Sequence, residues 1–167
     1  MPRLSKIRIT GNRYDGFQKG HEDSIFDLAA DHSLFTLQNG SGKGVMLQLI
    51  SQILLPGTSW GSNNGNKIEG MFYDRYNVFK PYTFHVVLEW KLDNSEKKRL
   101  LAGICVFAYR KKNLDDSEGK VGLKYFLYTH EYSGESRYNL DNLPLYSNSA
   151  GGVLDYDDMK DFIEENS

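Results

Sequence analysis

The chain has 167 residues, which is enough for one domain with a core of its own but leaves little room for a second. Its net charge of −2 at pH 7 excludes a whole-molecule attraction to nucleic acid, and its single cysteine, Cys105, excludes a disulfide framework and a cysteine metal cluster. Because no apolar run reaches the roughly 20 residues of a membrane span and no signal peptide opens the chain, we expect a cytoplasmic protein with no membrane partner.

The first part of the chain predicts short strands joined by turns. Residues 6–10 alternate charged and apolar side chains, as a half-buried strand does, and the glycine and asparagine that follow are expected to end this strand. A turn is expected at 13–16, and a second alternating strand at 24–28. A short apolar run at 34–37 predicts a further strand, and we expect these strands to form a mixed sheet.

The next stretch has the pattern of a phosphate-binding loop. Residues 36–45 have the sequence Thr-Leu-Gln-Asn-Gly-Ser-Gly-Lys-Gly-Val, and 45–55 predict a buried helix that stops at a proline and a glycine. Glycines let successive backbone N–H groups point inward, the lysine reaches the outer phosphates, and the helix N-terminus adds a partial positive charge. The candidate nucleotide-binding residues are Gln38, Asn39, Gly40, Ser41, Gly42, Lys43, Gly44 and Val45. The alternative is a glycine-rich turn from a strand into a helix, with an exposed lysine.

The loop departs from the full phosphate-loop pattern at two positions. Leu37 replaces the first glycine, which is a mild change because Leu37 can end the strand. Gly44 stands where the pattern has serine or threonine, whose hydroxyl would bind the Mg²⁺ of Mg·ATP. We therefore expect a site that binds ATP weakly, that lacks a direct protein ligand for Mg²⁺ at this position, and that does not hydrolyse ATP in the isolated chain.

The remaining chain predicts a long loop, an antiparallel lobe and a last helix. Residues 57–80 are rich in Gly, Ser and Asn, whereas strands at 84–92, 100–110 and 121–128 are separated by polar turns and predict a meander. Residues 133–152 are expected to be irregular. A helix should begin after the cap Asp155 and turn its apolar side inward, which consists of Met159, Phe162 and Ile163. Because this helix ends on acidic residues without a glycine stop, we expect the natural polypeptide to continue beyond Ser167.

Other side chains give weaker indications of chemistry. Two basic groups, at 97–99 and 110–112, are candidates for a patch that contacts the DNA backbone, although a charged hairpin rim explains them better. These residues are Lys97, Lys98, Arg99, Arg110, Lys111 and Lys112. The tyrosines in and after the last predicted strand, Tyr125, Tyr128 and Tyr132, would suit either a partner or a sheet. The four histidines are too scattered to form a local metal motif, and no catalytic residue is assigned.

The pattern resembles the N-terminal half of the ATPase head of SMC-like proteins, the structural-maintenance-of-chromosomes class with its MukB-like and defence-system relatives. The segment from Ile7 to Tyr14 looks like the first strand of this family followed by a short motif with a basic residue, and 39–43 match its phosphate loop. The resemblance implies an α/β P-loop NTPase half-domain of the ABC or SMC head type, with a mixed sheet and an antiparallel lobe after the loop helix. It also implies that Arg13 lies near the nucleotide phosphates, whereas a solvated turn arginine is the alternative.

The resemblance also implies that the site is incomplete. No Leu-Ser-Gly-Gly signature, no glutamine after the loop helix and no strand ending in Asp-Glu occur in the chain, and in the family these elements lie in the C-terminal half of the head. The expected segments are 1–56 with the loop and its helix, 57–80, the lobe at 81–132, and 133–167. The expected partners are the C-terminal half-head, a second head and possible DNA backbone, with ATP and Mg²⁺ as cofactors.

Three functions fit these expectations. The first is an ATP-binding head segment that acts in chromosome organisation or in defence against phages and plasmids, with hydrolysis only after the C-terminal half and a partner head complete it. The second is a degenerate nucleotide-binding module whose role is interaction. The third, a small P-loop metabolite kinase, fits worst because the strands after residue 83 have few convergent polar side chains.

Overall fold

The structure is a computed structural model, and it describes ten stretches of the chain. These stretches are 1–14, 18–29, 31–34, 36, 43–56, 81–92, 97–112, 118–134, 136–147 and 152–166, without the side chains of 110–112 and 118–121. The predicted turns at 93–96 and 113–117, the long loop at 57–80 and most of the glycine-rich loop lie outside the described residues.

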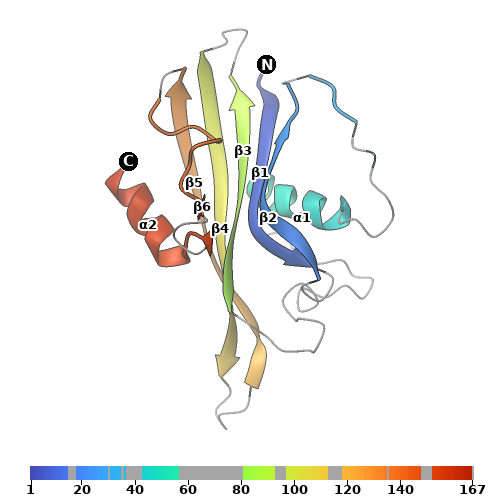
Figure 1. The fold of residues 1–167 in the computed structure, drawn as a ribbon, viewed down its shortest axis with the longest axis vertical. Helices are drawn as coiled ribbons and strands as arrows, with labels where there is room; N and C mark the ends of the chain where they lie inside the picture. Colours follow the sequence, from blue (N-terminus) through green and yellow to red (C-terminus); the bar gives the residue numbers. More distant parts are fainter. Residues whose placement is uncertain are drawn as a thin grey trace.

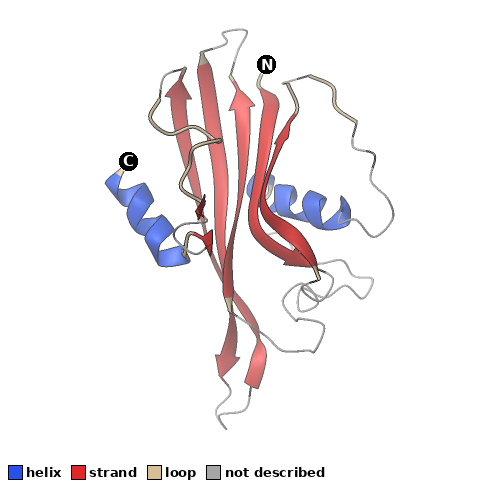
Figure 2. Cartoon of the chain, in the orientation of Figure 1, coloured by secondary structure: helices blue, strands red, loops and turns tan. Residues whose placement is uncertain are grey.

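A five-stranded sheet forms the centre of the molecule (Figures 1 and 2). Its strands are β1 (Arg3–Tyr14), β2 (Lys19–Asp27), β3 (Tyr82–Lys91), β4 (Lys98–Lys112) and β5 (Glu118–Ser133). They lie in the order β2-β1-β3-β4-β5, and every neighbouring pair is antiparallel. The predicted meander is therefore present as β3, β4 and β5. The described strands contain no parallel pair, and 31–34 and 36 are not in a strand, so this part of the chain shows no mixed sheet.

The first strand is longer than the sequence pattern predicts. We expected it to end at Gly11 and Asn12, but β1 pairs with β2 as far as Tyr14, opposite Lys19. Gly11 has a φ of 75°, which glycine adopts at little cost because it lacks a Cβ atom. The glycine therefore allows a kink within the strand and does not end it.

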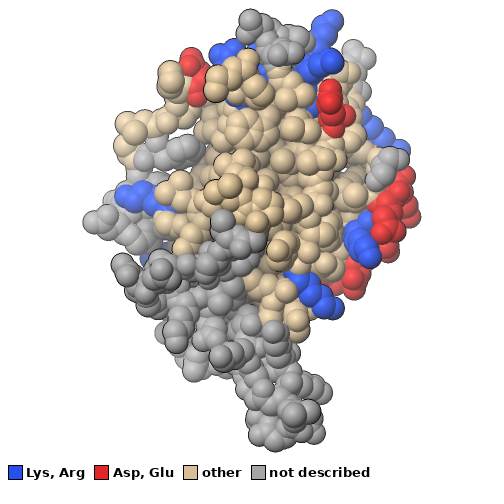
Figure 3. Space-filling view, turned by 180° about the vertical axis from the view of Figure 1, so that it is seen from behind, with Lys and Arg blue, Asp and Glu red and all other residues tan. Residues whose placement is uncertain are grey.

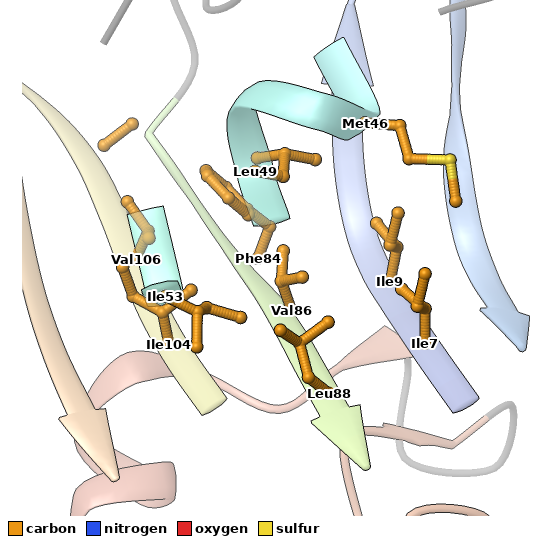
Figure 4. Packing of buried hydrophobic residues seen from close by; sticks show 11 residues of the cluster. Ile7, Ile9, Met46, Leu49, Ile53, Phe84, Val86, Leu88, Ile104 and Val106 are labelled. Atoms are coloured by element: carbon orange, nitrogen blue, oxygen red, sulfur yellow. The ribbon is translucent and has the colours of Figure 1, made fainter. Parts of the chain in front are cut away.

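One face of the sheet is covered by helix α1 (Lys43–Leu54). Its buried apolar side chains are Met46, Leu49 and Ile53, and Figure 4 shows the first of these near Ile9 on β1 and the last near Ile104 and Val106 on β4. The helix thus crosses the sheet from β1 to β4. Burying a side chain of this size contributes about 1.5–3 kcal/mol, so three of them anchor the helix firmly. The predicted loop helix is present at this place.

The opposite face is covered by a second layer that contains residues 136–147 and helix α2 (Tyr156–Glu165). The short strands β6 (Tyr146–Ser147) and β7 (Gly152–Val153) pair within this layer. Asp155 caps α2, because its side chain accepts a hydrogen bond from the backbone N–H of Tyr156. Met159 is buried, and Phe162 and Ile163 pack beside it. The prediction for this helix, its cap and its inward side chains is confirmed.

Two layers on the sheet also explain why β1 is not half-buried. The alternating pattern of 6–10 predicted that the polar side chains face solvent, but Arg8 is only 3% exposed and Thr10 is fully buried. Ile7 and Ile9 face α1, and the polar residues between them face the second layer. The pattern identified the strand and its alternation, whereas the second covered face depends on a segment about 130 residues away along the chain.

A close contact between neighbouring strands predicts a measurable stability effect. Gly103 on β4 lies opposite Tyr128 on β5, and a Cβ atom at this position would lie 2.2 Å from Cζ of the tyrosine. The Tyr128 ring is buried among the apolar side chains under α2, so it has little room to move. We expect Gly103→Ala to lower the free energy of unfolding by about 1–3 kcal/mol, measured by urea denaturation.

Gly122 provides the matched control for Gly103. A Cβ atom here would lie 2.6 Å from Cζ of Tyr109, the residue opposite Gly122 on β4, but the Tyr109 ring is only partly buried and can swing away. Gly122→Ala should therefore cost less than Gly103→Ala. Equal costs for the two variants would show that the buried ring of Tyr128 is not the cause.

Candidate functional site

The described part of the predicted phosphate loop begins at Lys43, which is the first residue of α1. Residues 37–42, which include both loop glycines and Asn39, lie outside the described residues. Lys43 and Gly44 are exposed, and Val45 is partly buried against the core under the helix. The structure thus brings together the last three candidate residues on the first turn of α1.

The N-terminal ends of the two described helices differ in a way that bears on anion binding. The first turn of α2 contains Asp157 and Asp158 in addition to its aspartate cap. These carboxylates compensate the partial positive charge of the helix end. The first turn of α1 contains no acidic residue. Because the first N–H groups of a helix have no partner within the helix, the start of α1 is suited to an external anion such as a phosphate group.

Gly44 has open space around it in the described part of the chain. No neighbouring atom of the described residues lies within 4 Å of a Cβ atom built at Gly44, and φ of this residue is not in the positive range that favours glycine. The structure therefore gives no steric reason for glycine at this position. A serine would fit here, and its hydroxyl would stand on the first turn of the helix.

Arg13 occupies a different place in the fold. It lies near the end of β1 opposite Gly20, and a Cβ atom at that glycine would lie 2.8 Å from Cδ of the arginine. The hydroxyl of Tyr146 on β6 donates a hydrogen bond to Glu22 at 2.8 Å, which raises the pKa of this tyrosine, and the positive charge of Arg13 opposes the rise. The arginine therefore lies near β6, and its expected position at the nucleotide phosphates stays a prediction.

The two candidate DNA-contacting groups lie at opposite ends of β4. Lys97 precedes the strand and Lys98 and Arg99 begin it, whereas 110–112 form its last residues. The strand has 15 residues, and at ~3.3 Å per residue its ends are roughly 45 Å apart. The two groups therefore do not form one patch, and contacts with DNA at both would be separate contacts.

Arg99, one residue of the two basic groups, forms an ion pair with a buried carboxylate. Glu89 on β3 is 4% exposed, and its Oε1 atom lies 3.7 Å from Nε of Arg99. The hydroxyl of Ser5 lies 2.5 Å from the same oxygen, and the hydroxyl of Tyr132 donates to Oε2. Burial, followed by this hydrogen bond, raises the pKa of Tyr132 well above its usual range. The geometry assigns Arg99 and Tyr132 a role within the fold, whereas Tyr125 of the same predicted set is exposed.

Arg8 on β1 connects the sheet to the second layer through several hydrogen bonds. Its Nε and Nη2 atoms donate to the two carboxylate oxygens of Asp23 at 2.9 and 3.0 Å, and Nη1 donates to the carbonyl oxygens of Leu140 and Leu143 at 2.8 and 3.0 Å. A carboxylate that accepts hydrogen bonds from two nitrogens of a guanidinium forms a strong and directional pair. This role could not be predicted from the sequence, because Arg8 looks like any solvent-facing residue of an alternating strand.

The described histidines include one that is buried in the sheet and one on the strand β2. His85 is fully buried on β3, and burial lowers its pKa to about 4, whereas the hydrogen bond to the carbonyl of Leu154 acts in the opposite direction. Burial also lowers the pKa of His21, whose Nδ1 atom lies 3.2 Å from the hydroxyl of Ser24. Among the described residues, no three His, Cys, Asp or Glu side chains are arranged to hold a metal ion.

No family model, curated protein or solved structure matches this chain. The helices within the described stretches lack the length and apolar character that a membrane crossing requires. The functional argument therefore rests on the loop pattern and on the geometry at the start of α1.

Proposed function

We propose that this chain is the ATP-binding N-terminal segment of an SMC-like ATPase head, which acts in DNA organisation or in defence against foreign DNA. The observation that carries this proposal is the position of Lys43. The glycine-rich loop leads directly into it, and it is the first residue of a helix that the apolar core anchors on the sheet. A lysine and the backbone N–H groups of the first helical turn at one end of the helix form a cradle that suits the phosphates of a nucleotide.

The proposal includes partners that complete the site. Neither an acidic residue that would position a catalytic water nor a side-chain ligand for Mg²⁺ is present at the described start of α1. Phosphoryl transfer depends on such groups. In this proposal they come from a C-terminal half of the head and from a second head, and the isolated chain binds ATP without turnover.

Replacing Lys43 should weaken ATP binding. We expect Lys43→Ala to lose about tenfold or more in affinity, because an ammonium group that contacts phosphate oxygens is removed from a charge-assisted interaction. Isothermal titration calorimetry of ATP against the purified chain measures this effect. Lys160→Ala is the matched control, because Lys160 is also an exposed helix lysine, 3.9 Å from Glu164 on α2. If both variants bind ATP as the parent does, the loop does not hold the phosphates.

A serine at position 44 should make nucleotide binding depend on Mg²⁺. Gly44→Ser adds a hydroxyl at a position with open space, and serine has a higher helix propensity than glycine, so stability should change by less than about 1 kcal/mol. The hydroxyl and the phosphate oxygens would then hold the metal jointly. Titration of ATP with Mg²⁺ and with EDTA should give a larger difference in affinity for the serine variant than for the parent. No added metal dependence would indicate that Gly44 does not face the phosphates.

The interaction module without turnover is the second candidate, and the open space at Gly44 favours it. The fold has room for a metal-binding hydroxyl at this position, yet the chain carries none. A site of this kind would bind nucleotide with equal affinity in Mg²⁺ and in EDTA and would stay inactive after the C-terminal half is added. ATPase assays of the completed head distinguish this function from the first.

A further inference from the structure

Strand β5 is one edge of the sheet. It pairs with β4 on one side, and no other strand in the described stretches pairs with its outer side. Figure 1 shows β5 as the outermost strand on one side of the sheet, with α2 beside it. The strand has 16 residues, which is long for an unpaired edge, and an edge of this length offers a row of backbone donors and acceptors to another strand.

The backbone groups that face outward can be assigned from the register. The N–H of Gly134 donates to the carbonyl of Lys97 at 3.0 Å, so the pair 97 and 134 is a hydrogen-bonded pair. Hydrogen-bonded and non-hydrogen-bonded pairs alternate along antiparallel strands, and even-numbered residues of β5 therefore bond to β4. The N–H and carbonyl groups of the odd-numbered residues, among them Tyr125, Leu127 and Thr129, point away from the sheet.

An apolar strip accompanies this edge on the α1 side. Tyr125 and Leu127 pair with Val106 and Ile104, two core residues of the α1 face, and they are 43% and 40% exposed. Figure 3 looks onto this side and shows a broad surface whose centre is free of Lys, Arg, Asp and Glu in the part of the chain that it describes. A strand added to β5 would place alternate side chains against this strip.

The other side of the same edge is acidic. The ring of Tyr156 packs on that of Phe126 at 5.1 Å, which fixes α2 next to β5. The exposed side of α2 carries five acidic residues, Asp157, Asp158, Asp161, Glu164 and Glu165, and one basic residue, Lys160. Figure 3 shows acidic side chains gathered at the margin where α2 lies. Side chains of an added strand that point to this side would meet negative charge.

We propose that the edge of β5 is a docking site for an extended basic segment of a partner protein, in which basic and apolar residues alternate. The segment adds a strand to the sheet through the outward backbone groups of β5. Its apolar side chains cover Tyr125 and Leu127, and its lysines or arginines face the acidic side of α2. This proposal does not depend on nucleotide binding.

A basic segment fits this edge better than a second copy of the chain does. Two copies joined edge to edge by a twofold axis would bring their two α2 helices to the same side of the joined sheet, and like charges would then approach each other. Lys124, the basic residue of β5 within this stretch, is not directed at the partner, because its Nζ atom lies 5.7 Å from the centre of the Tyr109 ring on β4. The charges along the edge therefore select for a cationic strand.

The probe is a fluorescein-labelled peptide of nine residues that alternates lysine and valine. Fluorescence anisotropy with the full chain should show binding that weakens with added salt, since charged groups contribute. Thr129→Pro removes an outward-pointing N–H group and leaves the ladder to β4 intact, so it should weaken binding about tenfold or more. Thr129→Ala keeps the N–H group and should bind as the parent does. Circular dichroism and the melting temperature test that both variants are folded.

Further peptides and variants separate the two sides of the edge. A peptide that alternates glutamate and valine, and a peptide with all lysines before all valines, should bind at least about tenfold more weakly. Asp158→Asn combined with Asp161→Asn should weaken the binding of the lysine–valine peptide and leave the binding of the other peptides unchanged. Equal affinity of the Thr129→Pro and Thr129→Ala variants, or equal binding of the block peptide, would overturn the proposal. A dimer of the parent chain that Thr129→Pro dissociates would also overturn it, in favour of a second copy as the occupant.

Discussion

Replacing Arg8 by methionine is expected to lower the free energy of unfolding by about 2–4 kcal/mol, because the buried guanidinium donates to two buried carbonyl oxygens, whereas its partner Asp23 stays in contact with water. The methionine fills most of the volume but donates no hydrogen bond. Asp23 then loses both of its guanidinium contacts, and the carbonyls of Leu140 and Leu143 lose the hydrogen bond from Nη1. Because these carbonyls belong to the layer that covers the sheet, the variant should also loosen 136–147. Urea denaturation and hydrogen exchange measure the two effects.

Two further variants test whether the buried contacts of Arg8 cause this effect. Lys6→Met removes a neighbouring ion pair, in which Nζ of Lys6 lies 2.6 Å from Oδ2 of Asp141 and the aspartate is half-exposed. Exposed pairs contribute little, so the cost should stay below about 1 kcal/mol. The double variant Arg8→Met with Asp23→Asn should cost about as much as Arg8→Met alone, because Asp23 is partly exposed and its carboxylate stays hydrated when the guanidinium is absent. A cost for Arg8→Met no larger than that for Lys6→Met would show that the guanidinium does not hold the second layer.

Local patterns in the sequence predicted most of the elements in the described stretches. The alternation from 84 to 128 gave the three strands of the meander, and Asp155 followed by Met159 gave the position and orientation of the last helix. These predictions succeeded because they rest on interactions between residues close in the chain. The kink at Gly11 and the burial of Arg8 were missed, since both depend on contacts with distant segments.

The candidate site could be predicted from the sequence less completely than the strands and helices. Lys43 and its helix follow from the motif alone, and the structure places both as the pattern indicates. The basic groups at 97–99 and 110–112 were considered as one patch, although the strand predicted at 100–110 lies between them, and β4 places them at its two ends. The ladder of unpaired groups on β5 is likewise a property of strand order, which a single sequence does not specify.

The stability of the fold should fall as the pH decreases from about 6.5 to about 4, and His85 should account for a loss of up to about 3 kcal/mol. Nε2 of His85 lies 2.7 Å from the carbonyl oxygen of Leu154, and a carbonyl only accepts, so this nitrogen carries the proton. Nδ1 is buried and has no hydrogen-bond partner among the described residues. Protonation of Nδ1 would place a positive charge in an apolar layer beside Arg8.

The direction of the pKa shift of His85 explains why stability falls as the pH decreases. Burial lowers the pKa of His85 from 6.5 to about 4, with the Leu154 carbonyl opposing this shift and the charge of Arg8 adding to it. Between these two values the unfolded chain binds a proton that the folded chain does not, so each step down in pH favours unfolding. The contribution of His85 is therefore complete above pH 6.5 and is lost by about pH 4.

Urea denaturation at pH 7, 6, 5 and 4 tests this prediction when His85→Gln is compared with the parent. Glutamine retains a donor for the Leu154 carbonyl but does not titrate. Between pH 7 and pH 4 the free energy of unfolding should therefore fall less in the variant than in the parent, and the difference between the two falls should reach about 3 kcal/mol. Carboxylates that titrate in the same range contribute equally to both proteins and cancel in the difference. Val87→Ala, a buried change two residues away on the same strand, should lower stability by a similar amount at every pH. The Val87→Ala curve should run parallel to that of the parent. If the His85→Gln curve also runs parallel to it, His85 is not the group that titrates.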